Sequence, residues 1–178
     1  MRRTLSLIGA AALTTVALLL PPGAAAASPT TTARAHPVLA FVLVTPNIAV
    51  APNGGMMASP GDRIEVTGGG AFAPATGTVR AGGRFTHRTA GGVVHCRGDW
   101  SATALTSWID FGGRRGIHGG VVSMLVTHRC ATTGEVHTDI PMTVTSTREA
   151  PPGSTYVDGT TVGDFTQPIA GAVVILGR

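Results

Sequence analysis

The sequence predicts an all-β fold, an antiparallel meander of about eight or nine strands that closes, or nearly closes, into a barrel. Glycine and proline supply 25 and 12 of the 178 residues and interrupt the chain at short intervals. The segments between them are rich in Val, Ile and Thr, which suit pleated, half-buried strands. Beyond the apolar N-terminal stretch, no segment repeats apolar residues at the period of a helix. A β-sandwich built from the same strands is the alternative.

The first 27 residues have the layout of a secretory signal peptide. Arg2 and Arg3 precede an apolar stretch, and Ala25-Ala26-Ala27 before Ser28 fits a small-residue cleavage site. The apolar stretch over 5–20 has 16 residues, whereas a spanning helix needs about 20. We therefore predict a secreted, extracellular protein with no stable membrane span after signal removal. A flexible leader at 28–35 and a single β-domain at 36–178 would follow.

Nine segments are expected to form the strands of this domain. They are Val38–Thr45, Arg63–Thr67, Thr76–Arg80, Arg84–Thr89, Val93–Trp108, Gly120–Cys130, Glu135–Thr147, Thr160–Phe165 and Ile169–Leu176. Residues 46–60 are expected to be a loop, with Met56 and Met57 as a hydrophobic plug. Gly68-Gly69-Gly70 is expected to form a tight turn or a bulge.

The two cysteines predict a disulfide and a strand register. Cys96 and Cys130 lie near the ends of two expected strands, and secreted proteins leave the reducing cytosol. If the cysteines lie directly opposite each other, Trp100 falls beside Val126, and one face of the pair is apolar throughout. The disulfide and the burial pattern then agree.

The next hairpin extends this apolar face. Residues 131–134, Ala-Thr-Thr-Gly, suit a short turn closed by a left-handed glycine. We expect Met124 beside Ile140 and Val122 beside Met142, which gives an apolar face across three strands.

The opposite face of these strands holds the candidate site. Asp99, Thr127 and His137 are expected in one row, where a carboxylate, a hydroxyl and an imidazole could bind a polar ligand or move a proton. Asp99 and His137 are thus the candidate catalytic residues. The candidate binding residues are Thr127, Arg97, Arg129, Glu135 and Asp139. The alternative is a solvated outer face of ion pairs and hydroxyls, as antiparallel sheets often have.

Charge and composition argue against nucleic-acid binding. All 13 basic residues are arginine, and the net charge of +4 falls to +2 when Arg2 and Arg3 leave with the signal peptide. Aromatic residues make up 4% of the chain, whereas nucleic-acid binding favours a basic stripe with aromatics nearby.

The sequence contains no pattern for a metal ion or a cofactor, and we predict neither. The six histidines form neither H-x-H nor H-E-x-x-H, and the two thiols are assigned to the disulfide. They are His36, His87, His95, His118, His128 and His137. No serine lies in a G-x-S-x-G elbow, so a hydrolase of that type is not indicated.

Several segments resemble a group of secreted actinobacterial all-β proteins with no established activity. The segments are 61–68 (GDRIEVTG), 82–87 (GGRFTH), 98–105 (GDWSATAL) and 162–165 (VGDF). The resemblance covers most of the chain after the signal peptide and rests on turn glycines and strand residues, so it implies a fold rather than a reaction. The glycine-rich meander is also similar, as a fold-level analogy, to the barrels of allene oxide cyclase and dirigent proteins.

Two functions remain open at this point. The favoured one is a non-catalytic secreted β-domain that acts in extracellular binding or as a surface component, with a small molecule or a cell-surface component as partner. The alternative is a small barrel enzyme, similar to a cyclase or isomerase, that acts on an apolar small molecule through Asp99 and His137. An enclosed pocket around these two residues would favour the enzyme.

Overall fold

The computed structural model describes residues 37–177. The predicted signal peptide, the predicted leader and His36 lie outside the described residues. The described chain forms nine strands and one short 3-10 helix. They are β1 Leu39–Val50, β2 Arg63–Ala73, η1 Pro74–Thr76, β3 Thr78–Arg88, β4 Val94–Arg114, β5 Ile117–Cys130, β6 Val136–Ser146, β7 Gly159–Val162, β8 Gln167–Ala170 and β9 Val173–Gly177.

The strands form one antiparallel sheet that curls into a nearly closed barrel, which confirms the predicted fold class. Hydrogen bonds connect β4, β3, β2, β1, β9 and β5 in that order, and β5 pairs with β4 again to complete a circuit of six strands. Strands β6 and β7 continue the sheet from β5, and β8 pairs with the second half of β1.

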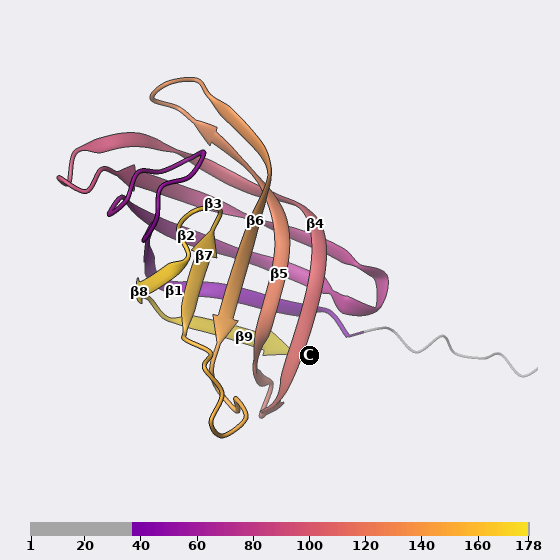
Figure 1. The fold of residues 1–178 in the computed structure, drawn as a ribbon. Coiled ribbons are helices and arrows are strands. Elements are labelled where there is room, and N and C mark those ends of the chain that lie inside the picture. The colour runs from indigo at the N-terminus through magenta and orange to yellow at the C-terminus, as the bar shows by residue number, and fades with distance from the viewer. Residues whose placement is uncertain (1–36, 178) are drawn as a thin grey trace, which may run out of the picture. The chain divides into compact units, whose positions relative to one another are not determined.

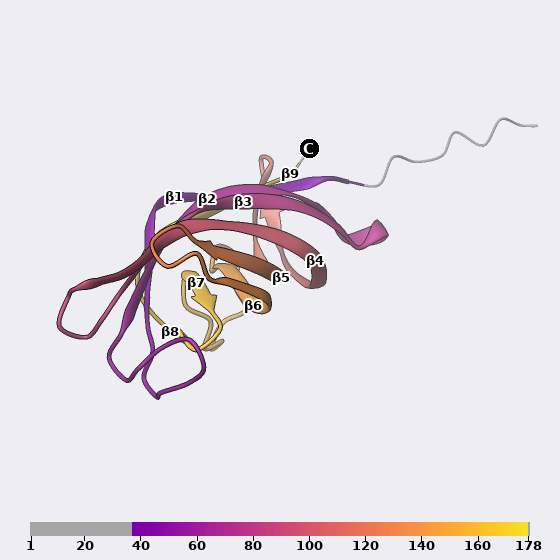
Figure 2. The ribbon, with the colours of Figure 1, turned by 90° about the horizontal axis from the view of Figure 1, so that it is seen from above.

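The long strand β4 links the two walls of the barrel. Strands β1 to β3 run behind and across β5 to β7 in Figure 1. Seen from above, β1 to β3 form an arch, and β4 and β5 curve from it toward β6 and β7 (Figure 2). Strand β4 pairs with β3 through its first half and with β5 over most of its length, so its bend carries the sheet from one wall to the other.

Glycines allow the backbones of β1, β2 and β3 to approach one another closely. Gly68-Gly69-Gly70, predicted as a tight turn or a bulge, forms no turn and lies inside β2, with Gly69 between Val42 and Gly82, but a register shift in the pairing with β1 begins at Gly68. A Cβ on Gly69 would clash with the backbone oxygen of Phe41, and one on Gly83 with that of Thr67. Glycine inside a strand often marks such a bend or close approach.

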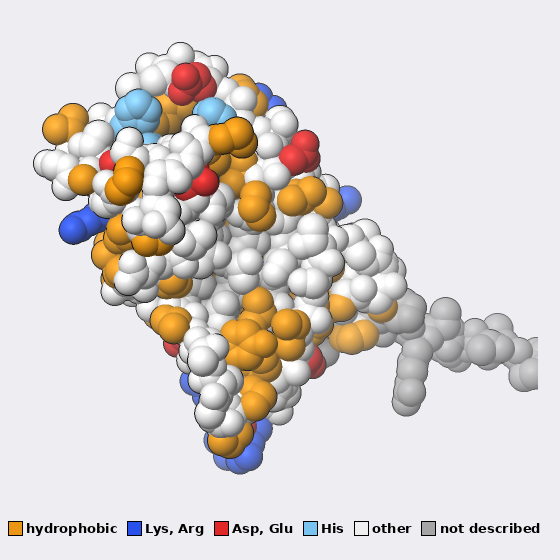
Figure 3. All heavy atoms as spheres, in the orientation of Figure 1, with side chains coloured by type: hydrophobic (Ala, Val, Ile, Leu, Met, Phe, Trp, Pro, Cys, Tyr) orange, Lys and Arg blue, Asp and Glu red, His pale blue; other side chains and the backbone are white. Residues whose placement is uncertain are grey.

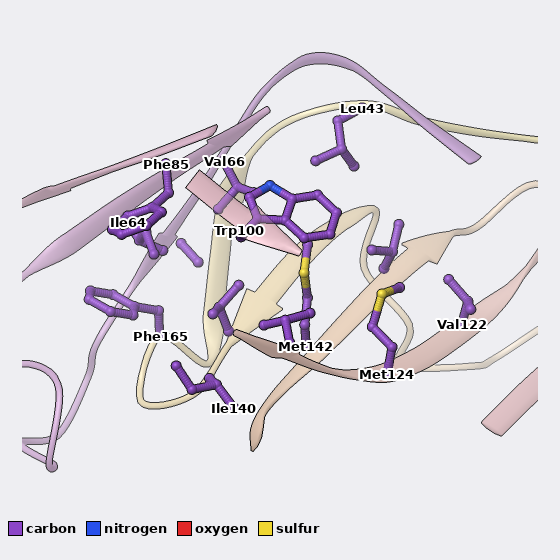
Figure 4. Packing of buried hydrophobic residues seen from close by; sticks show 14 of the residues in the cluster. Leu43, Ile64, Val66, Phe85, Trp100, Val122, Met124, Ile140, Met142 and Phe165 are labelled. Carbon is purple, nitrogen blue, oxygen red and sulfur yellow. The ribbon is translucent and has the colours of Figure 1, made fainter. Parts of the chain in front are cut away.

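Apolar side chains from both walls fill the interior. Figure 4 shows Ile64, Phe85 and Met142 pointing into the same space around Trp100. The Trp100 indole N–H donates to the backbone oxygen of Thr67 at 2.9 Å, which satisfies the one polar atom of this buried ring. The structure thus confirms the predicted core position of Trp100.

The Cys96–Cys130 disulfide is present, but the register between β4 and β5 differs from the prediction. Cys130 lies opposite Gly98 rather than Cys96, and Trp100 lies opposite His128 rather than Val126. The cysteines are diagonal neighbours with Cα atoms 5.8 Å apart, a distance that a disulfide spans readily. Because the error is two residues, the side chains of the paired segments 98–102 and 126–130 keep their predicted faces.

The register between β5 and β6 is also displaced by two residues. Met124 lies opposite Met142, and Val126 lies opposite Ile140. The apolar face across three strands is therefore present with different partners. Beyond Val126 the register shifts by one residue, so that His128 lies opposite His137.

Several strand boundaries differ from the expected ones. Strand β1 continues through Pro46 to Val50, so the loop to β2 spans 51–62. The two segments expected over 76–89 form one strand, β3, and the expected last strand is divided into β8 and β9. The loop 51–62, hereafter the β1–β2 loop, folds over one end of the barrel. There Met57 packs against the core, as predicted, but Met56 is 98% exposed.

Candidate functional site

Four histidines come together at the barrel end that carries the β1–β2 loop. His87 and His128 lie on β3 and β5 at positions that alternation directs inward. His95 is an extra residue on β4, because Arg88 pairs with Val94 and His87 pairs with Cys96. The histidine surface (pale blue) lies at the upper end of the face in Figure 3.

A second bulge brings His137 to the same place. Thr138 and Asp139 on β6 both face the single residue Thr127 on β5, and Asp139 has a left-handed φ of 57°. Bulges of this kind re-aim side chains beside functional sites. Without the extra residue, His137 would point to the outer face together with Arg129.

His128 is the most unusual residue of this end. Its side chain is 2% exposed, and both ring nitrogens lack a hydrogen-bond partner among the described residues. The imidazole stacks on Phe85, with ring centroids 4.5 Å apart. Burial, together with the nearby His137, lowers the pKa of His128 to about 4. The imidazole is therefore neutral at pH 7, with one N–H donor and one acceptor nitrogen.

The His128 ring lines a small, partly open space, hereafter the histidine cavity. Its volume is about 40 Å³, enough for about three water-sized groups. Its lining residues are Met57, Phe85, His87, His95, Cys96, His128, Cys130, Glu135 and His137. An unsatisfied buried polar group is costly, so the imidazole nitrogens require hydrogen-bond partners, and a space of this size admits water or a polar group of a ligand.

A carboxylate fixes the orientation of His87. Asp62 Oδ2 lies 3.0 Å from His87 Nε2, and the two Asp62 oxygens also accept the backbone N–H groups of Ser59 and Ala90. Burial raises the pKa of Asp62, but the hydrogen bonds from Ser59, His87 and Ala90 together hold it below its ordinary value. The ionised carboxylate can only accept, so Nε2 carries the hydrogen and Nδ1 remains an acceptor while His87 is neutral.

An open groove lies next to the histidine cavity. It has a volume of about 470 Å³ and runs between the β1–β2 loop and the turn at 89–91. Met57, His87 and His95 line both spaces. A hydrogen bond of 2.7 Å from the Met57 N–H to Asp164 Oδ2 holds the loop in place. A ligand could therefore lie in the groove and direct one polar group toward His128.

The structure separates the two predicted catalytic residues. Asp99 lies opposite Arg129 and His137 lies opposite His128, and successive residues on β5 point to opposite faces. The Asp99 side chain is 74% exposed on the outer face, where it lies 3.8 Å from the Arg84 guanidinium. The predicted row of Asp99, Thr127 and His137 is wrong because the β6 bulge reverses the direction of His137.

The predicted binding residues are also divided between the two faces. Arg97 and Arg129 are exposed on the outer face, but Glu135 lines the histidine cavity and accepts a hydrogen bond from Thr133. Glu135 therefore does not share the outer face with these two arginines. Thr127 is buried opposite Ser101, whereas Asp139 is exposed in the bulge.

The sequence interpretation missed Asp62, His87, His95 and His128 as members of one site. A signal for His128 was present, since it continues the inward series Val122, Met124 and Val126 and was therefore predictable as a buried histidine. The position of His95 had no such signal, because a bulge in β4 sets it.

Within residues 37–177, no three His, Cys, Asp or Glu side chains are placed so that they could hold a metal ion. In the same part of the chain, no helix has the length and apolarity to cross a membrane. Comparison with protein-family models, curated proteins and solved structures gives no match for this chain.

Proposed function

We propose that this protein is a secreted, non-catalytic binding domain that captures a small, uncharged, hydroxyl-bearing molecule at the histidine cavity. The observation that carries the proposal is His128, buried with two unpartnered ring nitrogens beside a cavity of about 40 Å³. Neutral imidazole offers one donor and one acceptor nitrogen, and a hydroxyl group, which can both donate and accept, fits whichever nitrogen faces the cavity.

The charges at this end favour an uncharged ligand. His128 stays neutral at pH 7 because its pKa is about 4, so it does not attract an anion. Asp62 is ionised, but its oxygens are occupied by His87 and by two backbone N–H groups, and Glu135, the other carboxylate here, accepts a hydrogen bond from Thr133. The groove of about 470 Å³ has room for the body of a small molecule beside Met57, Ala58 and Pro60.

Secretion is part of the same proposal. The signal-peptide pattern over 1–27 supports it, and the Cys96–Cys130 disulfide is compatible with an oxidising compartment outside the cytosol. The relation to secreted actinobacterial proteins stays a prediction from the quoted segments.

Native mass spectrometry of the protein from its own culture medium tests this proposal. We expect wild-type protein to carry a small molecule that collisional activation releases intact. A His128→Phe variant keeps an aromatic ring against Phe85 but removes both nitrogens, and we expect it to lack that molecule. Equal retention by both proteins would contradict a role for His128 in binding.

A second candidate is a small barrel enzyme that moves a proton. The observation in its favour is the hydrogen bond of 3.0 Å between Asp62 and His87, since a carboxylate that orients an imidazole is a common acid–base arrangement. These residues take the place of Asp99 and His137, which lie on opposite faces. If the released molecule were altered by wild-type protein but not by Asp62→Asn, the enzyme would be favoured over the binding domain.

A further inference from the structure

A second surface of the barrel, separate from the histidine cavity, is rich in arginine. Alternation along β2, β3, β4 and β5 directs six arginines to the outside of the barrel where these strands pair. They are Arg63, Arg80, Arg84, Arg88, Arg97 and Arg129, hereafter the arginine face. Five of them are exposed, and Arg88 is half-buried.

Positive charge on this face is poorly balanced. Only two carboxylates lie at the outward positions of β2, β3 and residues 97–103 of β4. They are Glu65 and Asp99. On these strands five arginines against two carboxylates leave +3, to which Arg129 on β5 adds, whereas the whole chain after residue 27 carries +2. The charge is therefore concentrated on one wall of the barrel.

Two pairings on this face indicate that its guanidinium groups could bind an external anion. Arg63 lies directly opposite Arg88 in the β2–β3 ladder, and like charges in such cross-strand pairs are destabilising. The Arg84–Asp99 ion pair, at 3.8 Å with side chains 86% and 74% exposed, contributes little because solvent screens it. Arg88 donates one hydrogen bond to the backbone oxygen of Gly92 at 3.3 Å, and the remaining donors of Arg63, Arg84 and Arg88 leave room for another partner.

The shape and the remaining side chains indicate what kind of anion fits. An open groove of about 340 Å³ lies on this face where β3 pairs with β4, and it is lined by Arg84, Thr86, Arg97 and Asp99, among others. Arg80, Arg84 and Arg88 follow one another every four residues along β3, a spacing of about 13 Å. Hydroxyl groups lie between the arginines, at Thr67, Thr86 and Ser101.

We propose that the arginine face binds a linear acidic polysaccharide outside the cell. The planar guanidinium group pairs with carboxylates through two hydrogen bonds, and the threonine and serine hydroxyls can bond to sugar hydroxyls. A broad sheet face with charges at intervals suits an extended polymer. This function goes beyond capture of a small molecule and does not depend on it.

Other polyanions fit this face less well. Proteins that bind single-stranded nucleic acid add aromatic side chains on which bases stack, and membrane-surface segments add large apolar anchors. The outward positions of β2, β3 and the first part of β4 hold no aromatic side chain: they are occupied by Arg, Glu, Thr, Ser, Asp, Gly and Ala.

The test is binding to immobilised polygalacturonate, a carboxylated polysaccharide, at low salt and over a salt titration. We expect wild-type protein to bind, with an affinity that falls as salt rises and no binding to neutral dextran. The triple variant Arg84→Gln, Arg97→Gln, Arg129→Gln should lose about tenfold or more in affinity, which is about 1.4 kcal/mol. These exposed positions tolerate substitution, and thermal unfolding verifies that the variant is folded.

A matched control distinguishes a specific face from net charge. Arg114→Gln, Arg115→Gln and Arg148→Gln remove the same charge from exposed positions away from the arginine face, and affinity should change less than about twofold. Equal losses in the two triple variants would overturn the proposal, as would no binding of wild-type protein at low salt. Tighter binding to duplex DNA or to phosphatidylglycerol vesicles than to polygalacturonate would also overturn it, because the partner would then belong to another class.

Discussion

His137 on β6 lies directly opposite His128 on β5, and both side chains share the inner face. Counted back from Ile140 by regular alternation, His137 would instead point to the outer face. The extra residue in the bulge at Thr138 and Asp139 causes this arrangement. A similar bulge at Val94 and His95 directs a third histidine to the same cavity. The histidine cavity is thus a product of two local irregularities in an otherwise regular sheet.

Replacement of His128 by Phe should separate stability from binding. The variant removes two buried nitrogens that have no hydrogen-bond partner among the described residues and keeps an aromatic ring beside Phe85. We expect the free energy of unfolding at pH 7 to rise by about 1–2 kcal/mol, as measured by urea unfolding. A loss of more than about 1 kcal/mol would mean that these nitrogens stabilise the fold themselves.

Stability should depend on pH through the same residue. His128 has a pKa of about 4 in the fold and about 6.5 in the unfolded chain. Below pH 6.5 the unfolded state binds a proton that the folded state does not, so stability present at pH 7 is lost as the pH falls toward 4. The expected loss is about 3 kcal/mol.

Urea unfolding at a series of pH values measures this dependence. Over the same interval His128→Phe should lose less stability than wild-type protein, by about the same 3 kcal/mol. Below that interval, the lowered pKa of Asp62 should continue to reduce stability in both proteins as its carboxylate is protonated. Parallel curves for the two proteins between pH 7 and 4 would exclude His128 as the source.

The close approach of β2 and β3 at Gly83 should be sensitive to a single methyl group. Gly83→Ala would place a Cβ against the backbone oxygen of Thr67, and backbone cannot move aside cheaply in a paired strand. We expect a loss of about 3 kcal/mol or more, or failure to fold. Gly91→Ala is the control, because its nearest neighbour is Thr89 Oγ1 at 3.8 Å. A Gly83→Ala variant as stable as Gly91→Ala would show that the close approach is not needed.

Removal of the disulfide should destabilise the barrel. The bridge links residues separated by 34 positions, for which loop entropy gives about 3–4 kcal/mol. The Cys96→Ala, Cys130→Ala double variant should therefore lose about that amount in urea unfolding. Wild-type protein under reducing conditions should match it, and a difference between these two would point to packing of the sulfur atoms rather than to chain entropy.

The fold class, the disulfide and the inward face of β5 could be predicted from the sequence. The signals for them are local: apolar and polar residues alternate along the strands, and glycine and proline interrupt them. Trp100, Met124 and Val126 were placed correctly in the core for this reason. The exact partners were wrong by two residues, since an even displacement leaves every face unchanged and the burial pattern cannot detect it.

The candidate site was harder to predict because it depends on bulges, each of which shifts the strand register by one residue and so reverses the face to which the following side chains point. One extra residue in β6 moves His137 from the outer face to the cavity, and one in β4 does the same for His95. Asp62 joins them from the end of the β1–β2 loop through its bond to His87. Neither bulge has a glycine or proline to mark it in the sequence.

The most direct test of the proposed binding function is an NMR titration that follows the ring nitrogens of His128 in ¹⁵N-labelled protein. The probes are uncharged alcohols and phenols, each paired with its methyl ether, which lacks the hydroxyl donor. We predict that at least one hydroxyl compound saturably shifts both His128 nitrogens, and that its methyl ether binds at least about tenfold more weakly. If the His128 nitrogens remained unshifted while other residues reported binding, the histidine cavity would not be the ligand site.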